Sequence, residues 1–314
     1  MIDIGVIGVG NMGQHHARIL SQHKRVNSTY IYDANESRAN KIGAETNALV
    51  CSTLNSLFSC VDAVIIATPT HTHYAIAKDA MEHGLHVLIE KPICKTLDDA
   101  EKLCLIGNEF SDLVAGVGHV ERFNPAAAVI KNTIQRPRYM SFVRHNPGSD
   151  RITDTTVVED LMIHDIDLLN CFVNLDFESA TLTSCGDKDT FVCSIWNDFP
   201  IVLSASRAAT KKTRTVYIED ENYTIVADLA DQSVYVYHKP EFYTLTSSGS
   251  FVSRANLQRV EPLHTELTAF LDCIHKKQQF PVTFTQGFTN LAICTMIIEC
   301  NIKTQINKSE RVPP

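Results

Sequence analysis

The strongest constraint in this 314-residue sequence is an alternation of short apolar runs with helical patterns over the first 120 residues. Strand-like runs occur at 2–8, 28–33, 62–68, 86–92 and 113–119. Most of them are followed by a segment in which apolar residues recur with helical spacing. The third run, DAVIIAT, is continuously apolar, as expected of a parallel strand buried on both faces. This order predicts a doubly wound parallel sheet of an α/β protein.

From about residue 138 the sequence changes character. Strand-like segments follow one another at 138–146, 177–185, 190–197, 200–207, 214–220, 222–229 and 232–239, and helical patterns remain at about 158–173, 262–277 and 286–304. Consecutive strands without intervening helices predict an antiparallel or mixed sheet. We therefore predict two domains, one over 1–120 and a second α/β domain over 121–314.

A glycine-rich segment marks the start of the first predicted helix. GVGNMG at 8–13 fits G-x-G-x-x-G, follows a predicted strand and opens a helix. Asp33 ends the second predicted strand, about 20 residues after Gly13. A glycine turn without a ligand is the alternative, but this combination of spacing and context is typical of dinucleotide binding.

Each glycine has a separate expected role. Gly8 permits a tight turn, Gly10 lets the pyrophosphate approach the backbone, and Gly13 lets the helix pack on the strand. The start of the helix offers positive potential to the phosphates. Asn11 and Met12 complete the predicted cofactor loop.

The acidic residue at the end of the second strand bears on the choice of cofactor. Asp33 would accept hydrogen bonds from ribose hydroxyls and repel a 2′-phosphate, so we predict NAD, with NADP less favoured. Arg38 is the residue that could oppose this preference. Its alternative role is that of a solvated charge on the following helix.

The segment after the third strand is expected to line the cofactor, because ligands of doubly wound sheets lie at the carboxyl ends of strands. It reads Thr68-Pro69-Thr70-His71-Thr72-His73. We predict cofactor contacts at Thr68, Pro69, Thr70 and His73, with a plain loop as the alternative. The HxH spacing could suggest a metal, but no third ligand lies nearby in the sequence, so we predict none.

Glu90, Lys91 and Pro92 follow the fourth strand of this series. The residue before a proline favours extended or turn geometry, which would direct Lys91 into the same crevice. We predict Glu90 and Lys91 as cofactor contacts. An ordinary surface lysine is the alternative for Lys91.

The segment DLMIHDID at 160–167 is predicted to be helical. Asp160 and His164 are four residues apart and share a helix face, to which Asp167 adds a further carboxylate. An aspartate one turn before a histidine can orient the ring and favour its protonated form. A solvated ion pair is the alternative.

Taken together, GVGNMG, Asp33, EKP at 90–92 and DLMIHDID at 160–167 resemble the Gfo/Idh/MocA oxidoreductase family, which includes glucose–fructose oxidoreductase and inositol dehydrogenase. The resemblance covers nearly the whole chain. It implies an N-terminal, dinucleotide-binding Rossmann domain over 1–120, followed by a substrate-binding and oligomerisation α/β domain over 121–314 that is built on a large, mostly antiparallel open sheet. It also implies assembly as a homodimer or homotetramer, to which the many strand faces of the second domain would contribute.

Three residues match the catalytic positions of that family, namely Lys91, Asp160 and His164. Neutral His164 can take the hydroxyl proton as a general base, and the Lys91 ammonium can stabilise the developing alkoxide. Asp160 can orient His164 and stabilise its protonated form. The same three residues are predicted to contact the substrate.

The segments 117–126 (VGHVERFNPA) and 151–169 are most similar to the branch that oxidises the 3-hydroxyl of UDP-N-acetylglucosamine. Members of that branch often have glycine where this chain has Thr156. This position lies in the loop before the helix, and the difference bears on the shape of that loop and so on the fit of the substrate. We predict an NAD-dependent oxidoreductase acting on a secondary hydroxyl of a nucleotide sugar. A free sugar or inositol dehydrogenase and a catalytically idle NAD-binding regulator remain alternatives.

Two arginines could bind the anionic part of such a substrate. A guanidinium suits a diphosphate or a carboxylate, and Arg122 and Arg151 lie near the predicted crevice in the sequence. Arg151 is the preferred candidate, and a structural role remains open for each.

The composition excludes several classes of partner. Lys and Arg number 28 and Asp and Glu number 36, which gives a formal net charge of −8. This balance leaves no broad basic surface, so neither nucleic acid nor a membrane is an expected partner. The 10 cysteines form no CxxC pair, and the N-terminus lacks the pattern of a signal peptide. We therefore expect free thiols and a cytoplasmic protein.

Overall fold

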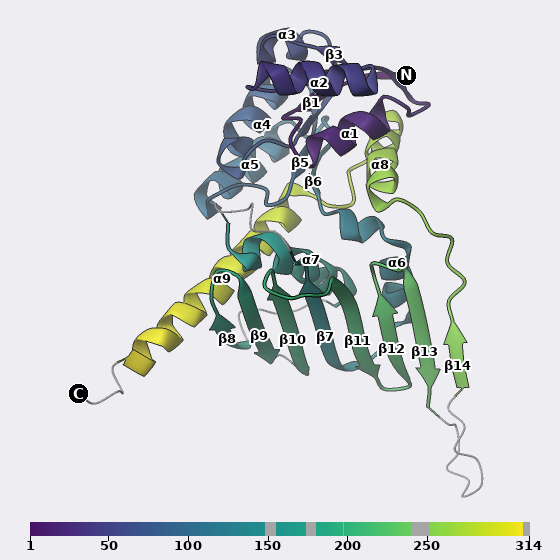
Figure 1. Ribbon diagram of the computed structural model, residues 1–314, viewed down its shortest axis with the longest axis vertical. Coiled ribbons are helices and arrows are strands. Elements are labelled where there is room, and N and C mark those ends of the chain that lie inside the picture. The colour runs from purple at the N-terminus through teal and green to yellow at the C-terminus, as the bar shows by residue number, and fades with distance from the viewer. Residues whose placement is uncertain (148–154, 174–179, 197, 240–250, 310–314) are drawn as a thin grey trace, which may run out of the picture. The chain divides into compact units, whose positions relative to one another are not determined.

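The computed structural model describes residues 1–147, 155–173, 180–196, 198–239 and 251–309 (Figure 1). The chain forms two compact units. The first comprises Met1–Val120 together with Glu261–Leu291, and the second comprises Glu121–Val260 and the residues from Ala292 onward. Among the described residues, none of the helices combines the length and apolarity needed to cross a bilayer.

The first unit is built on a six-stranded sheet. Its strands are β1 (Ile2–Ile7), β2 (Val26–Tyr32), β3 (Leu49–Val50), β4 (Ala63–Ile66), β5 (His86–Glu90) and β6 (Ala115–Gly118). Its helices are α1 (Gly13–Leu20), α2 (Glu36–Thr46), α3 (Leu54–Phe58), η1 (Thr70–Thr72), α4 (His73–Glu82), α5 (Leu97–Glu109) and α8 (Pro262–Lys276). The strand order is β3-β2-β1-β4-β5-β6 and the pairings are parallel. The predicted doubly wound sheet is confirmed.

Strand register brings the candidate residues of this unit to one edge. Ile7 pairs with both Tyr32 and Ile66, Ile66 pairs with Ile89, and Ile89 pairs with Val117. Parallel strands in this register end together, so the loops that follow β1, β2, β4 and β5 meet at their carboxyl ends. Side-chain caps fix where the intervening helices begin, as Asn35 does for α2 and Thr96 for α5.

The chain returns to the first unit near its C-terminus, which corrects the predicted contiguous second domain of 121–314. Glu261–Leu291 belongs to the first unit. One apolar contact and one backbone hydrogen bond account for this placement. Phe280 packs against Gly116, and the Val117 N–H donates to the Val282 carbonyl at 3.0 Å. Helix α8 also buries Leu267 and contacts α1.

The second unit is built on an eight-stranded sheet whose strands lie side by side in Figure 1. Its strands are β7 (Pro137–His145), β8 (Thr181–Gly186), β9 (Thr190–Trp196), β10 (Pro200–Ser206), β11 (Thr213–Asp220), β12 (Tyr223–Asp228), β13 (Ser233–His238) and β14 (Phe251–Arg254). Its helical elements are η2 (Val120–Phe123), α6 (Pro125–Thr133), η3 (Val158–Met162), α7 (Ile163–Phe172) and the later part of α9 (Phe284–Ser309). The strand order is β14-β13-β12-β11-β7-β10-β9-β8.

This second sheet is mostly antiparallel, as predicted. Among the described strands, β7 and β10 pair in parallel and the other pairs are antiparallel. Residues of one face, such as Phe142, Leu203 and Ile218, pack with η3, α7 and α9 residues in the core. The opposite face carries exposed apolar side chains, including Trp196 and Tyr217.

Candidate active site

The glycine loop after β1 has the geometry that a dinucleotide requires. Gly8 has φ +83°, and a Cβ there would lie 2.8 Å from the Ala67 carbonyl oxygen. A Cβ on Gly13 would lie 1.8 Å from the Gly8 carbonyl oxygen, so helix and strand pack too closely for any side chain. At Gly10 the nearest atom is Arg38 Nη1 at 4.0 Å, which leaves that position open. The loop is therefore tight on its inner side and accessible where a pyrophosphate would approach.

Asn11 and Met12 are exposed at the outer side of this loop, and α1 begins directly after them. The Gln14 N–H donates to the Gly10 carbonyl at 3.1 Å, which closes the first helical turn. The first N–H groups of a helix lack intrahelical partners and favour anions. This end of α1 thus offers the donors that cofactor phosphates need.

Asp33 is fixed at the end of β2, beside the glycine loop. Its Oδ2 accepts a hydrogen bond from the Val9 N–H at 2.9 Å, and its Oδ1 accepts one from the Asn35 N–H at 2.8 Å. Arg38 Nη1 lies 3.3 Å from Asp33 Oδ2. Arg38 is therefore an ion-pair partner of Asp33, which the solvated-charge interpretation did not anticipate.

The loop after β4 is joined to the segment after β5 by a buried histidine. The His73 ring has Nε2 2.9 Å from the Thr68 carbonyl oxygen and Nδ1 2.9 Å from the Pro92 carbonyl oxygen. Burial lowers the pKa of His73, and a neutral ring donates to one of these two carbonyls. The side chain predicted to contact cofactor thus lies between two loops, with a carbonyl oxygen of each beside one ring nitrogen.

Thr68, Pro69 and Thr70 themselves lie at the start of η1. The Thr72 hydroxyl is 2.7 Å from Thr68 Oγ1 and 2.8 Å from the Pro69 carbonyl oxygen. These contacts keep the loop compact at the carboxyl edge of the sheet. Their predicted contacts with the cofactor remain predictions.

Glu90, the last residue of β5, faces inward. Its Oε1 lies 2.8 Å from Nε2 of buried His16, and its Oε2 accepts the Lys91 N–H at 3.2 Å. Burial alone would raise the pKa of Glu90, but the hydrogen bond and charge of His16 and the charge of Lys91 lower it below its ordinary value. The carboxylate predicted to contact cofactor is thus engaged by His16. Lys91 is half-buried and joined to Pro92 by a cis peptide bond.

In the second unit, Asp160 and His164 lie where two helix types meet. Asp160 is in the π-helix η3, and His164 is in the first turn of α7. The sequence predicts one continuous α-helix, whereas π geometry uses i→i+5 hydrogen bonds and shifts the rotation between the two positions. Single π turns occur often at functional sites.

Asp160 has an arginine partner that the sequence did not predict. Arg207 follows β10, and its Nη2 lies 3.1 Å from Asp160 Oδ2. The same Nη2 donates to the Thr155 carbonyl at 3.1 Å. Both side chains are buried, so this pair fixes the start of η3 against the end of β10.

The other two aspartates of this segment are also paired. Asp167 accepts two hydrogen bonds from Arg122, Nε at 2.6 Å and Nη2 at 2.8 Å. The guanidinium predicted to bind substrate is thus held by a buried carboxylate, and Asp167 pairs with an arginine rather than extending the Asp160–His164 face. Arg151, the other candidate, lies outside the described residues.

Asp165 belongs to a buried charge network beneath α7. Arg144 on β7 donates to Asp165 from Nη2 at 2.7 Å and to Glu121 from Nη1 at 2.8 Å. Arg214 on β11 is 3.1 Å from the same Glu121 oxygen. The sequence offered only the repeated aspartates of DLMIHDID as a signal, because their partners lie on distant strands.

Thr156 has a local role at the position where the resembling branch often has glycine. Its N–H and hydroxyl lie 2.9 and 3.0 Å from Glu159 Oε2, and the Glu159 N–H is 3.3 Å from Thr156 Oγ1. This reciprocal arrangement is a capping box, which fixes the start of the helical segment.

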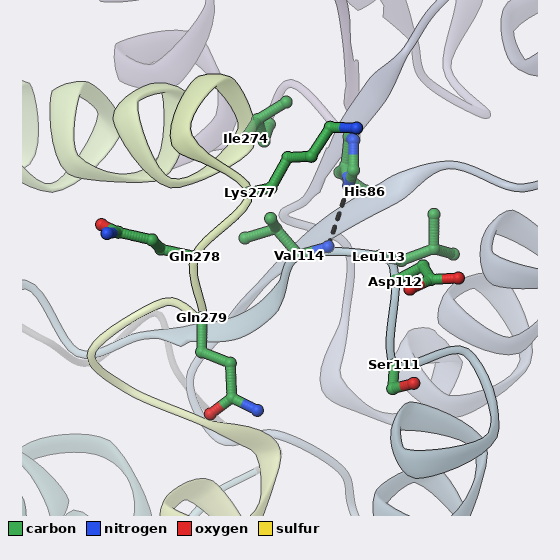
Figure 2. A pocket seen from close by; sticks show the side chains of 9 residues that line it. All are labelled: His86, Ser111, Asp112, Leu113, Val114, Ile274, Lys277, Gln278 and Gln279. Atoms are coloured by element: carbon green, nitrogen blue, oxygen red, sulfur yellow. Dashed lines mark hydrogen bonds between the residues drawn. The ribbon is translucent and has the colours of Figure 1, made fainter.

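A separate cavity of about 460 Å³ lies at the opposite ends of β5 and β6 (Figure 2). It is lined by His86, Ser111, Asp112, Leu113, Val114, Ile274, Lys277, Gln278 and Gln279. The Val114 N–H donates to His86 Nδ1 at 2.8 Å. Because His86 begins β5 and Lys91 follows it, this cavity is distinct from the candidate cofactor edge. Within the described part of the chain, no group of three or more His, Cys, Asp or Glu residues is placed to hold a metal ion.

Comparison with known proteins agrees with this geometry. Residues 2–119 match the family model described as "Oxidoreductase family, NAD-binding Rossmann fold". UDP-N-acetylglucosamine 3-dehydrogenase of Acidithiobacillus ferrooxidans is 32% identical over 278 residues, which cover 86% of this chain and 88% of that protein. The chain belongs to the Gfo/Idh/MocA oxidoreductase family. It is thus an oxidoreductase of an NAD-binding family, as the resemblance implied.

Other members and solved structures support the same assignment. Inositol 2-dehydrogenase of Rubrobacter xylanophilus is 24% identical over 273 residues, covering 83% of this chain and 76% of that protein. A structure of the A. ferrooxidans enzyme superposes with a TM-score of 0.86 at 27% identity, covering 95% and 97% of the two chains. A levoglucosan dehydrogenase in complex with NADH and levoglucosan, at 20% identity and a TM-score of 0.84 over 96% and 97%, shares the fold.

Proposed function

We propose that this protein oxidises a secondary hydroxyl of a nucleotide-linked sugar, at C3 of a substrate like UDP-N-acetylglucosamine, with NAD as the cofactor. The observation that carries this proposal is the extent of the likeness to UDP-N-acetylglucosamine 3-dehydrogenase, which covers 86% of the chain and so includes residues of both units. A likeness limited to the first unit would support a cofactor but no substrate.

The cofactor site of the proposal rests on the first unit. Gly8 and Gly13 form the tight turn, Gly10 leaves room for the pyrophosphate, and the Asp33 carboxylate suits the ribose hydroxyls. When bound there, NAD supplies the hydride acceptor. The ion pair with Asp33 directs the Arg38 guanidinium toward a carboxylate rather than toward the 2′-phosphate of NADP. In this proposal Asp33 therefore favours NAD over NADP.

Three side chains carry the proposed proton chemistry. Oxidising an alcohol requires a base for the hydroxyl proton, which we assign to His164. The Lys91 ammonium stabilises negative charge on the substrate oxygen, and its backbone is held by Glu90. Asp160 orients His164, and Arg207 in turn fixes the Asp160 carboxylate.

A cofactor and substrate screen tests this function. We expect NADH formation, followed by absorbance, with UDP-N-acetylglucosamine and NAD, and at least about 10-fold lower kcat/KM with free N-acetylglucosamine or myo-inositol, because binding of the remote nucleotide contributes to the rate. Calorimetry is expected to show tighter binding of NAD than of NADP.

Each alternative has its own outcome in this screen. Turnover of myo-inositol but not of UDP-sugars would replace the nucleotide-sugar proposal, an alternative favoured by the inositol dehydrogenase among the relatives. NAD binding without turnover of any sugar would indicate a regulator. Tighter binding of NADP would contradict the role given to Asp33.

The exposed face of the second sheet supports the proposal of a homo-oligomer. Val192, Trp196, Tyr217, Tyr237 and Val252 are exposed there, and Trp196 is 59% accessible. Large apolar side chains left exposed on one face of a sheet suit an interaction surface. A second copy of this chain is the occupant we propose, because most soluble oligomers are symmetric homo-oligomers.

Light scattering at micromolar concentration is expected to give a mass of at least twice the monomer's 35.0 kDa. The double variant Trp196→Glu/Tyr217→Glu should shift this mass to that of the monomer, since two charges would be buried unpaired. Leu105→Glu is the matched control, because Leu105 is an equally exposed apolar side chain on α5. A wild-type protein that is monomeric would contradict the proposal.

A further inference from the structure

Two successive histidines on α1 differ completely in their surroundings. His15 is exposed, whereas His16 is 1% accessible and its Nε2 lies 2.8 Å from Glu90 Oε1. His16 lies one turn after Gly13, on the helix that starts at the cofactor loop. Its contact joins this helix to the end of β5, the segment that carries Lys91.

The direction of this hydrogen bond follows from the two groups. The pKa of Glu90 lies below its ordinary value in spite of burial, so Glu90 is a carboxylate and the His16 Nε2–H donates to it. Among the described residues, His16 Nδ1 has no hydrogen-bond partner. The hydrogen bond of the His16 ring thus runs through Nε2, toward Glu90.

Glu90 also contacts the backbone of the next residue, Lys91. Its second oxygen, Oε2, accepts the Lys91 N–H at 3.2 Å. On the other side of the same segment, His73 on α4 lies 2.9 Å from the Pro92 carbonyl oxygen. Buried histidines from two helices thus contact the Glu90–Pro92 segment at its two ends.

We propose that His16 is a positioning residue, which fixes the Lys91 backbone through Glu90 and so sets the direction of the Lys91 ammonium group. Because His16 lies on α1, this contact also links the position of Lys91 to the helix whose start offers donors to the cofactor phosphates. This role rests on the proposed function of Lys91. Without the His16 donor, the buried Glu90 carboxylate loses its side-chain hydrogen bond and keeps the backbone N–H and the charge of Lys91, so we expect the segment to rearrange.

Two measurements on His16→Leu, His16→Gln and His15→Leu test this role. The first is kcat and KM with NAD and the sugar identified in the screen. The second is the rate of reductive methylation of Lys91 in cofactor-free protein, measured by peptide mass spectrometry relative to exposed Lys95. This second rate requires no turnover.

We expect His16→Leu to lower kcat by about 10- to 100-fold with little change in KM, because small displacements of a reacting group cost that much. Lys91 should become methylated at least about 3-fold faster, since its segment is no longer held in one arrangement. His16→Gln, which keeps an N–H donor, should recover most of both values, and His15→Leu should match wild type.

If wild-type protein turns over no sugar, the proposed function fails while the methylation rates still decide the role of His16. A folded His16→Leu variant whose Lys91 is methylated at the wild-type rate overturns the positioning role, whatever its kcat. If His16→Leu does not fold, His16→Leu/Glu90→Gln replaces it, because it removes the unpaired buried charge. The same two changes are expected there, and an unchanged methylation rate has the same meaning.

Discussion

Lys91→Met and His164→Ala are each expected to lower kcat for NADH formation by about 10²- to 10⁴-fold, the range that a general base or a charge-stabilising group contributes. Lys91→Met keeps the length of the side chain and removes its positive charge. His164→Ala removes the base. His164→Ala should still bind NAD with nearly wild-type affinity, because the glycine loop and Asp33 are unchanged, whereas Lys91→Met also loses a predicted cofactor contact.

The measurement is initial-rate absorbance with the sugar found in the screen, combined with calorimetry of NAD binding. Lys95→Met and His275→Ala are matched controls, since both replace exposed side chains of the first unit. These two should retain wild-type kcat. Full activity in either Lys91→Met or His164→Ala would remove the proposed mechanism.

Arg144→Met is expected to destabilise the second unit by about 3–5 kcal/mol, the usual cost of removing one partner from a buried ion pair. The Arg144 side chain is 2% accessible and contacts both Asp165 and Glu121. Its loss removes the guanidinium that contacts Asp165 and leaves Glu121 with Arg214 and the Asn124 amide. The free energy of unfolding is measured in urea at fixed protein concentration, because association would change the apparent stability.

The single tryptophan makes this measurement specific. Trp196 lies on β9 of the second unit, so its fluorescence follows that unit, and light scattering along the same urea series separates dissociation of the proposed oligomer from unfolding. Arg136→Met is the control: Arg136 pairs with Glu221 but its side chain is 79% accessible. Its loss should change the free energy of unfolding by less than about 1 kcal/mol. Equal effects of the two substitutions would contradict the importance of the buried network.

The same network predicts a dependence on pH. Burial alone would raise the pKa of Glu121, but Arg144 and Arg214 lower it below its ordinary value. Stabilisation from Glu121 is therefore complete above the ordinary glutamate pKa and is lost as the pH falls through the lowered value. In Arg144→Met much of this lowering disappears, so the free energy of unfolding of the variant, measured in urea across this pH range, should fall less steeply on acidification than that of wild type.

The first unit shows how much of a fold local sequence can specify. Its parallel sheet follows from apolar runs and helical spacing, which are set within about ten residues of each strand. Strand β3 (Leu49–Val50) and helix α3 (Leu54–Phe58) were not predicted, because two exposed strand residues and five helical ones carry almost no periodic signal. In the second unit, α6 (Pro125–Thr133) and β14 (Phe251–Arg254) were missed as well.

The candidate site shows the same contrast between residues that local sequence reveals and residues that it does not. The glycine motif, Asp33 and the lysine after β5 were recognisable because a turn, a strand end and a proline constrain their neighbours directly. Arg207 was not, because nothing beside it in the sequence indicates that it would reach Asp160, 47 residues earlier. The buried contact of His16 with Glu90 spans 74 residues and was equally invisible.

By itself, therefore, the sequence determined the parallel sheet, the cofactor loop and the resemblance that the comparisons confirmed. The tertiary structure decided the partners of the charged residues: Arg122 for Asp167, Arg144 for Asp165 and Arg207 for Asp160. It also decided that Glu261–Leu291 packs in the first unit. Local propensity depends on neighbours in the chain, whereas a buried charge takes the partner that strand register and packing bring within hydrogen-bond distance.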